Sequence, residues 1–252
     1  MRRELLYKPH MLLERLLEVA SRRHRLNRLR RTPARVLVHD HIQSLELLDI
    51  VQHEIAPRTV YDVGANRGTW SLLARSICPQ AEIHAFEPLT EVREEFRKNV
   101  AAVGCVALHS VALGCSNVRT EMFVHRFFDA SSFLPLTDRE RAKWSDHLLE
   151  QRELELVTLD DYVAGHGLPA PDLLKLDVQG YEIEVLKGAT RTLSRVSAVI
   201  SEVSFRQTYA GQPLFGTVAG FLSAAGFETT AFSHGTKAGE RLDQADVLFL
   251  RA

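Results

Sequence analysis

The chain has 252 residues, of which 45% are hydrophobic and 25% are charged, a composition that indicates a globular protein with a substantial core. A formal net charge of −1 argues against a chain that binds nucleic acid over its whole surface. No apolar run approaches the ~20 residues of a membrane-spanning helix, no secretory signal is visible, and three scattered cysteines suit a reducing compartment. We therefore expect a cytoplasmic protein.

The first part of the chain is basic. Residues 1–35 contain ten Arg and one Lys against three Glu. Apolar residues near the start recur at helical spacing, namely Leu12, Leu13, Leu16, Leu17 and Ala20. This pattern predicts an amphipathic helix that ends before Pro33. A second helix is predicted over residues 41–56. We interpret residues 1–56 as a helical extension that packs on the main domain or on a partner subunit. Attraction to the inner face of the membrane or to an anionic substrate is the alternative.

Residues 57–252 alternate strands and helices. We expect strands over residues 58–64, 82–88, 105–113, 172–178, 196–205, 227–232 and 245–251, and helices over 68–78, 89–104, 181–195 and 215–226. This order predicts one α/β domain with a doubly wound, mostly parallel, seven-stranded sheet and helices on both faces. Residues 119–126 and 153–159 also look like strands, around a loop that is either a lid or an edge elaboration. In such sheets the ligand lies beyond the carboxyl ends of the central strands.

The stretch "DVGANRG" lies where the first strand ends. Gly64 can adopt backbone angles denied to other residues, and Gly68 allows the next helix to pack closely. Glu87 ends the second strand, 23 positions after Gly64, near the ~20-residue offset at which an acid binds a ribose in nucleotide-binding βαβ units. Together these residues predict a ligand that contains adenosine.

The residues around the first glycine distinguish two such ligands. The dinucleotide fingerprint places three glycines in GxGxxG, but this turn reads DxGxxxG, with Asp62 two residues before Gly64. A carboxylate there suits the amino group of a methionine moiety and disfavours a pyrophosphate. We therefore expect S-adenosylmethionine as the cofactor, and an NAD-linked oxidoreductase is the alternative.

At this point the sequence resembles a known family. The motifs "VYDVGANRGTWS", "HAFEP", "VALG", "VTLDDY", "LLKLDVQGYEIEVLKGA", "ISEVSF" and "ADVLFLR" stand in the order found in FkbM-type methyltransferases. The resemblance runs from about Arg58 to Arg251. It implies a Rossmann-like class I methyltransferase fold for residues 57–252, with S-adenosylmethionine as donor and S-adenosylhomocysteine as product. It also implies O-methylation of a sugar or natural-product hydroxyl.

The resemblance assigns site residues by their places in the motifs. The stretch "HSVALG" departs from the generic methyltransferase pattern, which often has an acid near the end of the third strand. The implied cofactor residues are Asp62, Gly64, Ala65, Asn66 and Gly68 in the turn, Glu87 and Pro88 after the second strand, Ser110 and Val111 after the third, and Asp177 after the fourth.

A hydroxyl acceptor loses its proton as it attacks a methyl group, so the site needs a base. Asp177 is the first candidate. Lys175, two residues earlier on the same face of the strand, would keep Asp177 ionised, although a structural ion pair would look the same in the sequence. Glu202, in "ISEVSF" near the end of the next strand, is the second candidate.

Other features bear on metals and partners. His39, Asp40 and His41 have no further ligand pattern around them, so we predict no metal site. The expected partner is a small-molecule or glycan acceptor. A methyltransferase that binds nucleic acid through the basic extension is a further alternative, but the extension lacks the interleaved aromatic residues of a single-strand platform. A homo-oligomer formed through the extension stays open.

Overall fold

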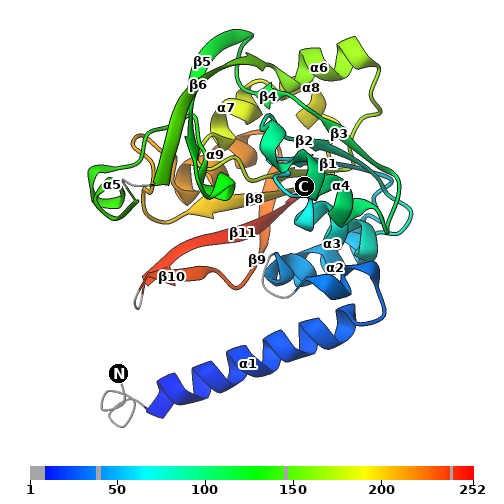
Figure 1. Ribbon diagram of the computed structural model, residues 1–252. Helices are drawn as coiled ribbons and strands as arrows, with labels where there is room; N and C mark the ends of the chain where they lie inside the picture. The colour runs from blue at the N-terminus through cyan, green and yellow to red at the C-terminus, as the bar shows by residue number, and fades with distance from the viewer. Residues whose placement is uncertain (1–8, 38–40, 145–146, 239–240) are drawn as a thin grey trace.

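The computed structural model describes residues 9–37, 41–144, 147–238 and 241–252. Its main sheet has the strand order β3-β2-β1-β7-β8-β11, with β9 on the far side of β11 (Figure 1). The strands β1 to β3, β7 and β8 pair in parallel, and β11 runs antiparallel to β8 and β9. The seven predicted strands correspond to β1 (Thr59–Val63), β2 (Glu82–Phe86), β3 (Val106–His109), β7 (Leu173–Leu176), β8 (Ala198–Ser204), β9 (Phe227–Phe232) and β11 (Arg241–Arg251). The predicted class I methyltransferase fold is confirmed, with the short β10 (Thr236–Ala238) added as a hairpin on β11.

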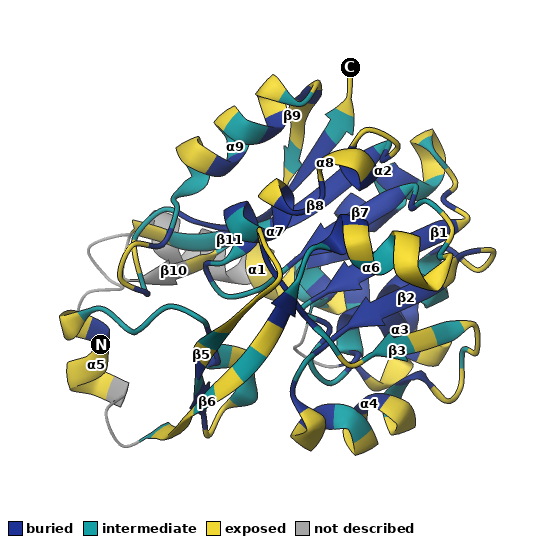
Figure 2. Cartoon of the chain, turned by 90° about the horizontal axis from the view of Figure 1, so that it is seen from above, coloured by how far each residue is buried: buried dark blue, intermediate teal, exposed yellow. Residues whose placement is uncertain are grey.

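Helices cover both faces of this sheet (Figures 1 and 2). The central strands β1 and β7 are buried at every position, as expected for parallel strands that lie between two helical layers. One core cluster joins the sheet to α2 (Leu45–Glu54) and α3 (Thr69–Ile77), with α4 (Arg93–Val100) beside α3. The cluster on the other face includes side chains from α6 (Leu159–His166), α7 (Glu182–Lys187), α8 (Thr190–Leu193) and α9 (Phe215–Ala224).

A second, three-stranded sheet lies over the carboxyl edge of the first. It has the order β4-β6-β5 and contains β4 (Ala112–Leu113), β5 (Val118–His125) and β6 (Leu148–Val157). Between β5 and β6 lie η5 (Phe128–Ala130) and α5 (Asp138–Trp144). The two predicted strands here are confirmed, but the single strand expected over residues 105–113 is wrong. The chain leaves the main sheet at His109 and pairs with β6 at Ala112.

The N-terminal extension has two parts, which differ in how they pack on the main domain. Helix α1 (Pro9–Leu29) extends away from the sheet (Figure 1), whereas η2 (Pro33–Val36), η3 (Ile42–Ser44) and α2 contribute Ala34, Ile42 and Leu45 to the main core. The described contacts of α1 with the rest of the chain include buried Leu29, an ion pair from Arg25 to Glu46 at 2.6 Å and an ion pair from Arg28 to Asp49. Residues 29–37 and 41–56 are therefore built into the main domain.

The close approach of the first turn to β7 can be tested at Gly64. Its φ is +81°, and a Cβ there would lie 1.8 Å from the Asp177 carbonyl oxygen. Gly104 has a similar φ of +58°, but a Cβ there would meet nothing within 4 Å. In urea unfolding followed by circular dichroism, we expect Gly64→Ala to lose at least ~3 kcal/mol of stability and Gly104→Ala about 1 kcal/mol. Equal losses would show that the turn does not press against β7.

Candidate functional site

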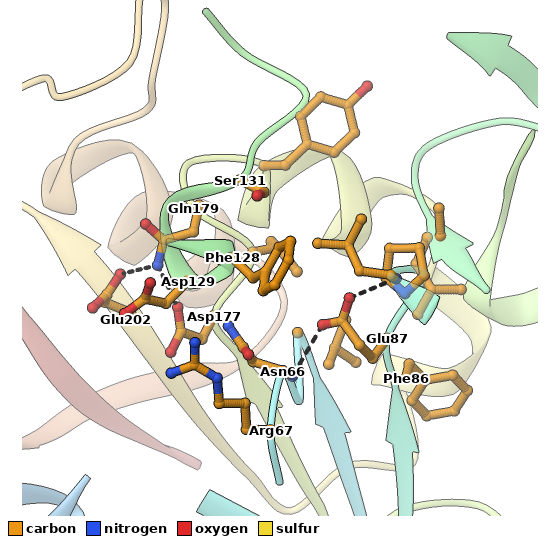
Figure 3. A pocket seen from close by; sticks show the side chains of 18 of the residues that line it. Asn66, Arg67, Phe86, Glu87, Phe128, Asp129, Ser131, Asp177, Gln179 and Glu202 are labelled. Atoms are coloured by element: carbon orange, nitrogen blue, oxygen red, sulfur yellow. Dashed lines mark hydrogen bonds between the residues drawn. The ribbon is translucent and has the colours of Figure 1, made fainter. Parts of the chain in front are cut away.

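A cavity of about 420 Å³ lies at the carboxyl edge of the main sheet, between β1, β2, β7 and β8 and the second sheet (Figure 3). Its volume is within the range of roughly 300–1,000 Å³ that is typical of small-molecule sites. Ligands of doubly wound sheets bind at this edge. Of the residues expected at the site from the sequence, those that line the cavity are Gly64, Asn66, Glu87, Pro88, Val111, Asp177 and Glu202.

The other expected residues lie behind the cavity wall or beside it. Asp62 and Lys175 are almost completely buried, and Ala65 is buried with Phe96 of α4. Gly68 is the N-cap of α3. Ser110 is exposed where the chain passes from β3 to β4. Contact of these residues with a cofactor stays a prediction.

Three residues of the turn after β1 have a positive φ, namely Gly64, Asn66 and Gly68. Asn66 has a φ of +44°, a conformation that Asn tolerates better than most residues. Its side-chain Oδ1 is buried with no hydrogen-bond partner, although Asn66 lines the cavity. Gly68 has a φ of +74°, and a Cβ there would lie 2.7 Å from the Phe96 ring. Glycine at position 68 therefore makes room for Phe96 of α4, whereas the sequence analysis expected it to make room for the next helix, α3. The turn also leaves the Asn66 amide oxygen without a partner.

Glu87 is a buried carboxylate fixed by backbone donors. Its Oε2 accepts from the Asn66 N–H at 3.0 Å, and its Oε1 accepts from the Leu89 N–H at 2.8 Å (Figure 3). Burial raises the pKa of Glu87 to about 7, against the two backbone hydrogen bonds that lower it. A carboxylate has about four acceptor positions, so two remain for hydroxyl donors in the cavity.

Lys175 is the buried cation of the site, and Arg67 also lines the cavity. Its Nζ lies 3.2 Å from Asp177 Oδ2 and 3.5 Å from Asp62 Oδ1, while the second oxygen of Asp62 accepts from Ser71 Oγ at 2.6 Å. Burial alone would lower the pKa of Lys175, but the carboxylates of Asp177 and Asp62 raise it. Burial alone would raise the pKa of Asp177, but the Lys175 ammonium lowers it. Both groups are therefore charged at neutral pH.

Glu202 has a different environment from Asp177. Its Oε2 accepts from the amide nitrogens of Gln179 and Gln244, both at 3.2 Å. Burial, together with the charges of Asp177 and Asp246, raises the pKa of Glu202 well above its ordinary value. The two carboxyls thus differ: Asp177 is held ionised by a cation, and Glu202 takes up a proton more readily.

Gln179 joins the two carboxylates and was not singled out from the sequence. Its Nε2 donates to Asp177 Oδ1 at 2.9 Å as well as to Glu202 (Figure 3). Its Oε1 accepts from the Tyr209 hydroxyl at 3.0 Å, and its backbone oxygen accepts from Ser132 Oγ at 2.7 Å. A φ of +53° brings the side chain into this position. The only sequence signal was its place in "KLDVQGYE".

Two further groups of lining residues were also missed. The segment between β5 and β6, which was left unassigned, contributes one wall. Residues just before α2, in the predicted extension, contribute another. The first group is Phe128, Asp129, Ser131 and Phe133, and the second is His41 and Gln43.

Among the residues that the structure describes, no group of three or more His, Cys, Asp or Glu side chains is placed to hold a metal ion. His39 and Asp40, which the sequence analysis considered, lie outside the described residues.

The strand order and the cavity at its carboxyl edge define a Rossmann-like class I methyltransferase domain. Residues 62–229 match the family model described as "Methyltransferase FkbM domain". The chain belongs to this family, as its motifs predicted.

Several characterised proteins are similar to the chain. The 2-O-methyltransferase NoeI of Sinorhizobium fredii is 27% identical over 61% of this chain and 66% of its own length. The hexuronic acid methyltransferase AglP of Haloferax volcanii is 29% identical over 57% of this chain and 55% of its own length. The 31-O-demethyl-FK506 methyltransferase FkbM of Streptomyces tacrolimicus is 29% identical over 73% of this chain and 78% of its own length. The matched region thus spans under two thirds of the first relative and about half of the second.

The role of the Lys175 ammonium can be tested by removing its charge. Lys175→Met leaves two buried carboxylates without their cation, and breaking a buried ion pair in this way costs about 3–5 kcal/mol. We expect that loss in the free energy of unfolding, measured in urea at pH 7. The matched control is Lys98→Met, because Lys98 pairs with Glu94 on the surface of α4 and its loss should leave stability nearly unchanged. Similar values for the two variants would contradict the assigned role.

Proposed function

We propose that this protein is an S-adenosylmethionine-dependent O-methyltransferase that acts in the cytoplasm on a hydroxyl of a sugar or natural product. The single observation that supports this most is one continuous cavity with Glu87 at one end and the Asp177–Glu202 pair at the other. Membership of the FkbM methyltransferase-domain family supports the same reaction. The named relatives act on a 2-O position, a hexuronic acid and a demethylated FK506, which supports the acceptor class.

The residues present fit this cofactor. Glu87 has two free acceptor positions for the ribose hydroxyls, and the unpartnered Oδ1 of Asn66 can accept from the ammonium of the methionine end. Val111 and Leu113 line the cavity beyond Glu87 and offer apolar surface to the adenine. The bound cofactor supplies an activated sulfonium methyl group. The protein then has to orient the acceptor oxygen behind that methyl, and such positioning supplies roughly 7–11 kcal/mol of a barrier.

Of the two candidate bases, Glu202 suits the proton transfer better. An efficient base has a pKa near the working pH, and the pKa of Glu202 is raised by burial and by neighbouring carboxylates. Asp177 is held ionised by Lys175, at a pKa below its ordinary value, which makes it a weak base. We therefore assign Glu202 as the base and Asp177 as the group that orients the acceptor and keeps negative charge near the sulfonium.

Cofactor identity is tested first, because it needs no acceptor. S-adenosylmethionine, S-adenosylhomocysteine and NAD are compared by thermal shift and by calorimetric titration. A ligand present at 100 times its Kd adds about 2.7 kcal/mol of stability. We expect this for the first two compounds and no shift with NAD. Binding of NAD alone would overturn the proposal. Methyl transfer is then followed with a panel of hydroxylated sugars and natural products.

Glu87 should control cofactor affinity and its pH dependence. Hydrogen bonds to a charged group contribute ~1.5–3 kcal/mol, so Glu87→Ala should weaken S-adenosylhomocysteine binding roughly ten- to hundredfold. Because the pKa of Glu87 is about 7, binding by the ionised form should be strong above pH 7 and weaken up to about tenfold per unit below it.

The conservative variant separates charge from shape. Glu87→Gln cannot ionise, so its calorimetric Kd for S-adenosylhomocysteine should lose this dependence on pH while the fold is retained. If both variants bind with the parent's affinity at pH 8, Glu87 does not bind the ribose.

Glu202→Gln tests the base. The amide keeps the shape but accepts no proton, so kcat should fall by a factor of roughly 10²–10⁴ while the Kd of S-adenosylhomocysteine stays within about threefold. The parent's kcat should rise as pH increases through the Glu202 pKa, since only the carboxylate acts as a base. Asp177→Asn is the paired variant: if it loses the pH dependence and Glu202→Gln keeps it, the two roles are reversed.

A further inference from the structure

Helix α1 has two faces with different surroundings. Leu29 and Arg25 are 1% and 6% exposed and lie at i and i−4 on the side that contacts α2, where Arg28 also binds Asp49 through both guanidinium nitrogens. Leu17 and Val19 are 61% and 65% exposed. Large apolar side chains of α1 are therefore uncovered away from the anchored end of the helix, which extends beyond the body of the protein (Figure 1).

The exposed residues form one stripe. Helical neighbours lie three or four positions apart, so Leu17, Ala20, Arg23, Asn27 and Arg30 follow one another along the side opposite Leu29, and each is exposed. We call this stripe the outer face of α1. The outer face is thus apolar in its first half and cationic in its second.

The acidic residue Glu18 of α1 lies in a different helical register from the outer face, namely that of Arg25 and Leu29. Glu18 precedes Arg22, Arg25 and Leu29 at helical spacing, so it lies in the register of the anchored side, although Glu18 itself is exposed. Among the described residues, the outer face therefore combines exposed Leu17 and Ala20 with Arg23 and Arg30, has exposed Val19 at its margin, and includes no carboxylate. A helix that served only to pack on its own domain would turn its apolar residues inward.

We propose that the outer face of α1 docks on the surface of an anionic lipid bilayer. An interfacial helix buries an apolar stripe between headgroups while Arg and Lys pair with anionic lipids, and this is the distribution on the outer face. None of the helices in the described part of the chain is long and apolar enough to cross a bilayer, so the contact is peripheral. The proposal does not depend on the methyltransferase reaction.

A second copy of the chain fits the outer face less well. Two such faces packed against each other would bring Arg23 and Arg30 of both copies together, and like charges in close contact are unfavourable. The Leu17 and Val19 side chains alone offer a small apolar contact for a stable dimer. Dimerisation is therefore an outcome that the experiment must separate from lipid binding.

The test uses the full chain and sedimentation with two kinds of vesicle, one of pure phosphatidylcholine and one of equimolar phosphatidylcholine and phosphatidylglycerol. We expect binding to the anionic vesicles at least about tenfold stronger than to the neutral ones, and weakened by added salt. Arg23→Gln/Arg30→Gln should reduce partition into anionic vesicles by roughly thirtyfold, since each arginine contributes about fivefold. Leu17→Glu/Val19→Glu should reduce it at least about tenfold.

Matched controls carry the same chemical changes on other surfaces. Leu148→Glu/Leu149→Glu removes two exposed apolar residues of β6, and Arg97→Gln/Arg195→Gln removes two exposed arginines of the body; both should bind as the parent does. Light scattering of each variant reports mass in solution. Equal binding to both vesicles, no binding to either, or a dimer that Leu17→Glu/Val19→Glu dissociates would each overturn the proposal.

Discussion

The site depends on one buried ammonium at the carboxyl edge of the sheet. Lys175 lies between Asp62 on β1 and Asp177 after β7, so a single cation links the turn that lines the cavity to the strand end that carries the reactive carboxylates. It also lies 5.5 Å from the ring of Trp70, the second residue of α3. Because a buried charge is costly without partners, this contact fixes the turn, the strand and the helix relative to one another.

The same cation does not balance the charge of the site. Asp62, Asp177, Glu202 and Asp246 lie around it, and burial together with the charge of Asp177 raises the pKa of both Glu202 and Asp246. Such a deficit of positive charge is relieved by a cationic ligand and aggravated by an anionic one. A sulfonium and an ammonium group are both cations, whereas a pyrophosphate is an anion. The carboxylates of Asp177, Glu202 and Asp246 thus add to that of Asp62 in favouring the proposed cofactor.

The features of this protein that could be predicted from the sequence are those that depend on the order of the strands. The buried apolar strands and the positions of Glu87, Asp177 and Glu202 at strand ends follow from periodicity and spacing, and all three line the cavity. Spacing cannot tell which way a side chain points, so Asp62 was expected to face the ligand although it faces Lys175 and Ser71. Gln179 and Tyr209 were not predicted as site residues because their contact joins residues 30 positions apart. The contact also depends on the positive φ of Gln179, which no local sequence pattern predicts.

The amide of Gln179 connects the chemistry to the wall of the cavity. One side chain binds Asp177, Glu202 and the Tyr209 hydroxyl, and the same hydroxyl lies 3.0 Å from the backbone oxygen of Ala130 between β5 and β6. A hydroxyl has one proton, so Tyr209 can donate to only one of these two oxygens at a time. A molecule that binds beside Phe128 and Phe133 therefore meets a wall of the cavity that is hydrogen-bonded, through Tyr209 and Gln179, to Asp177 and Glu202.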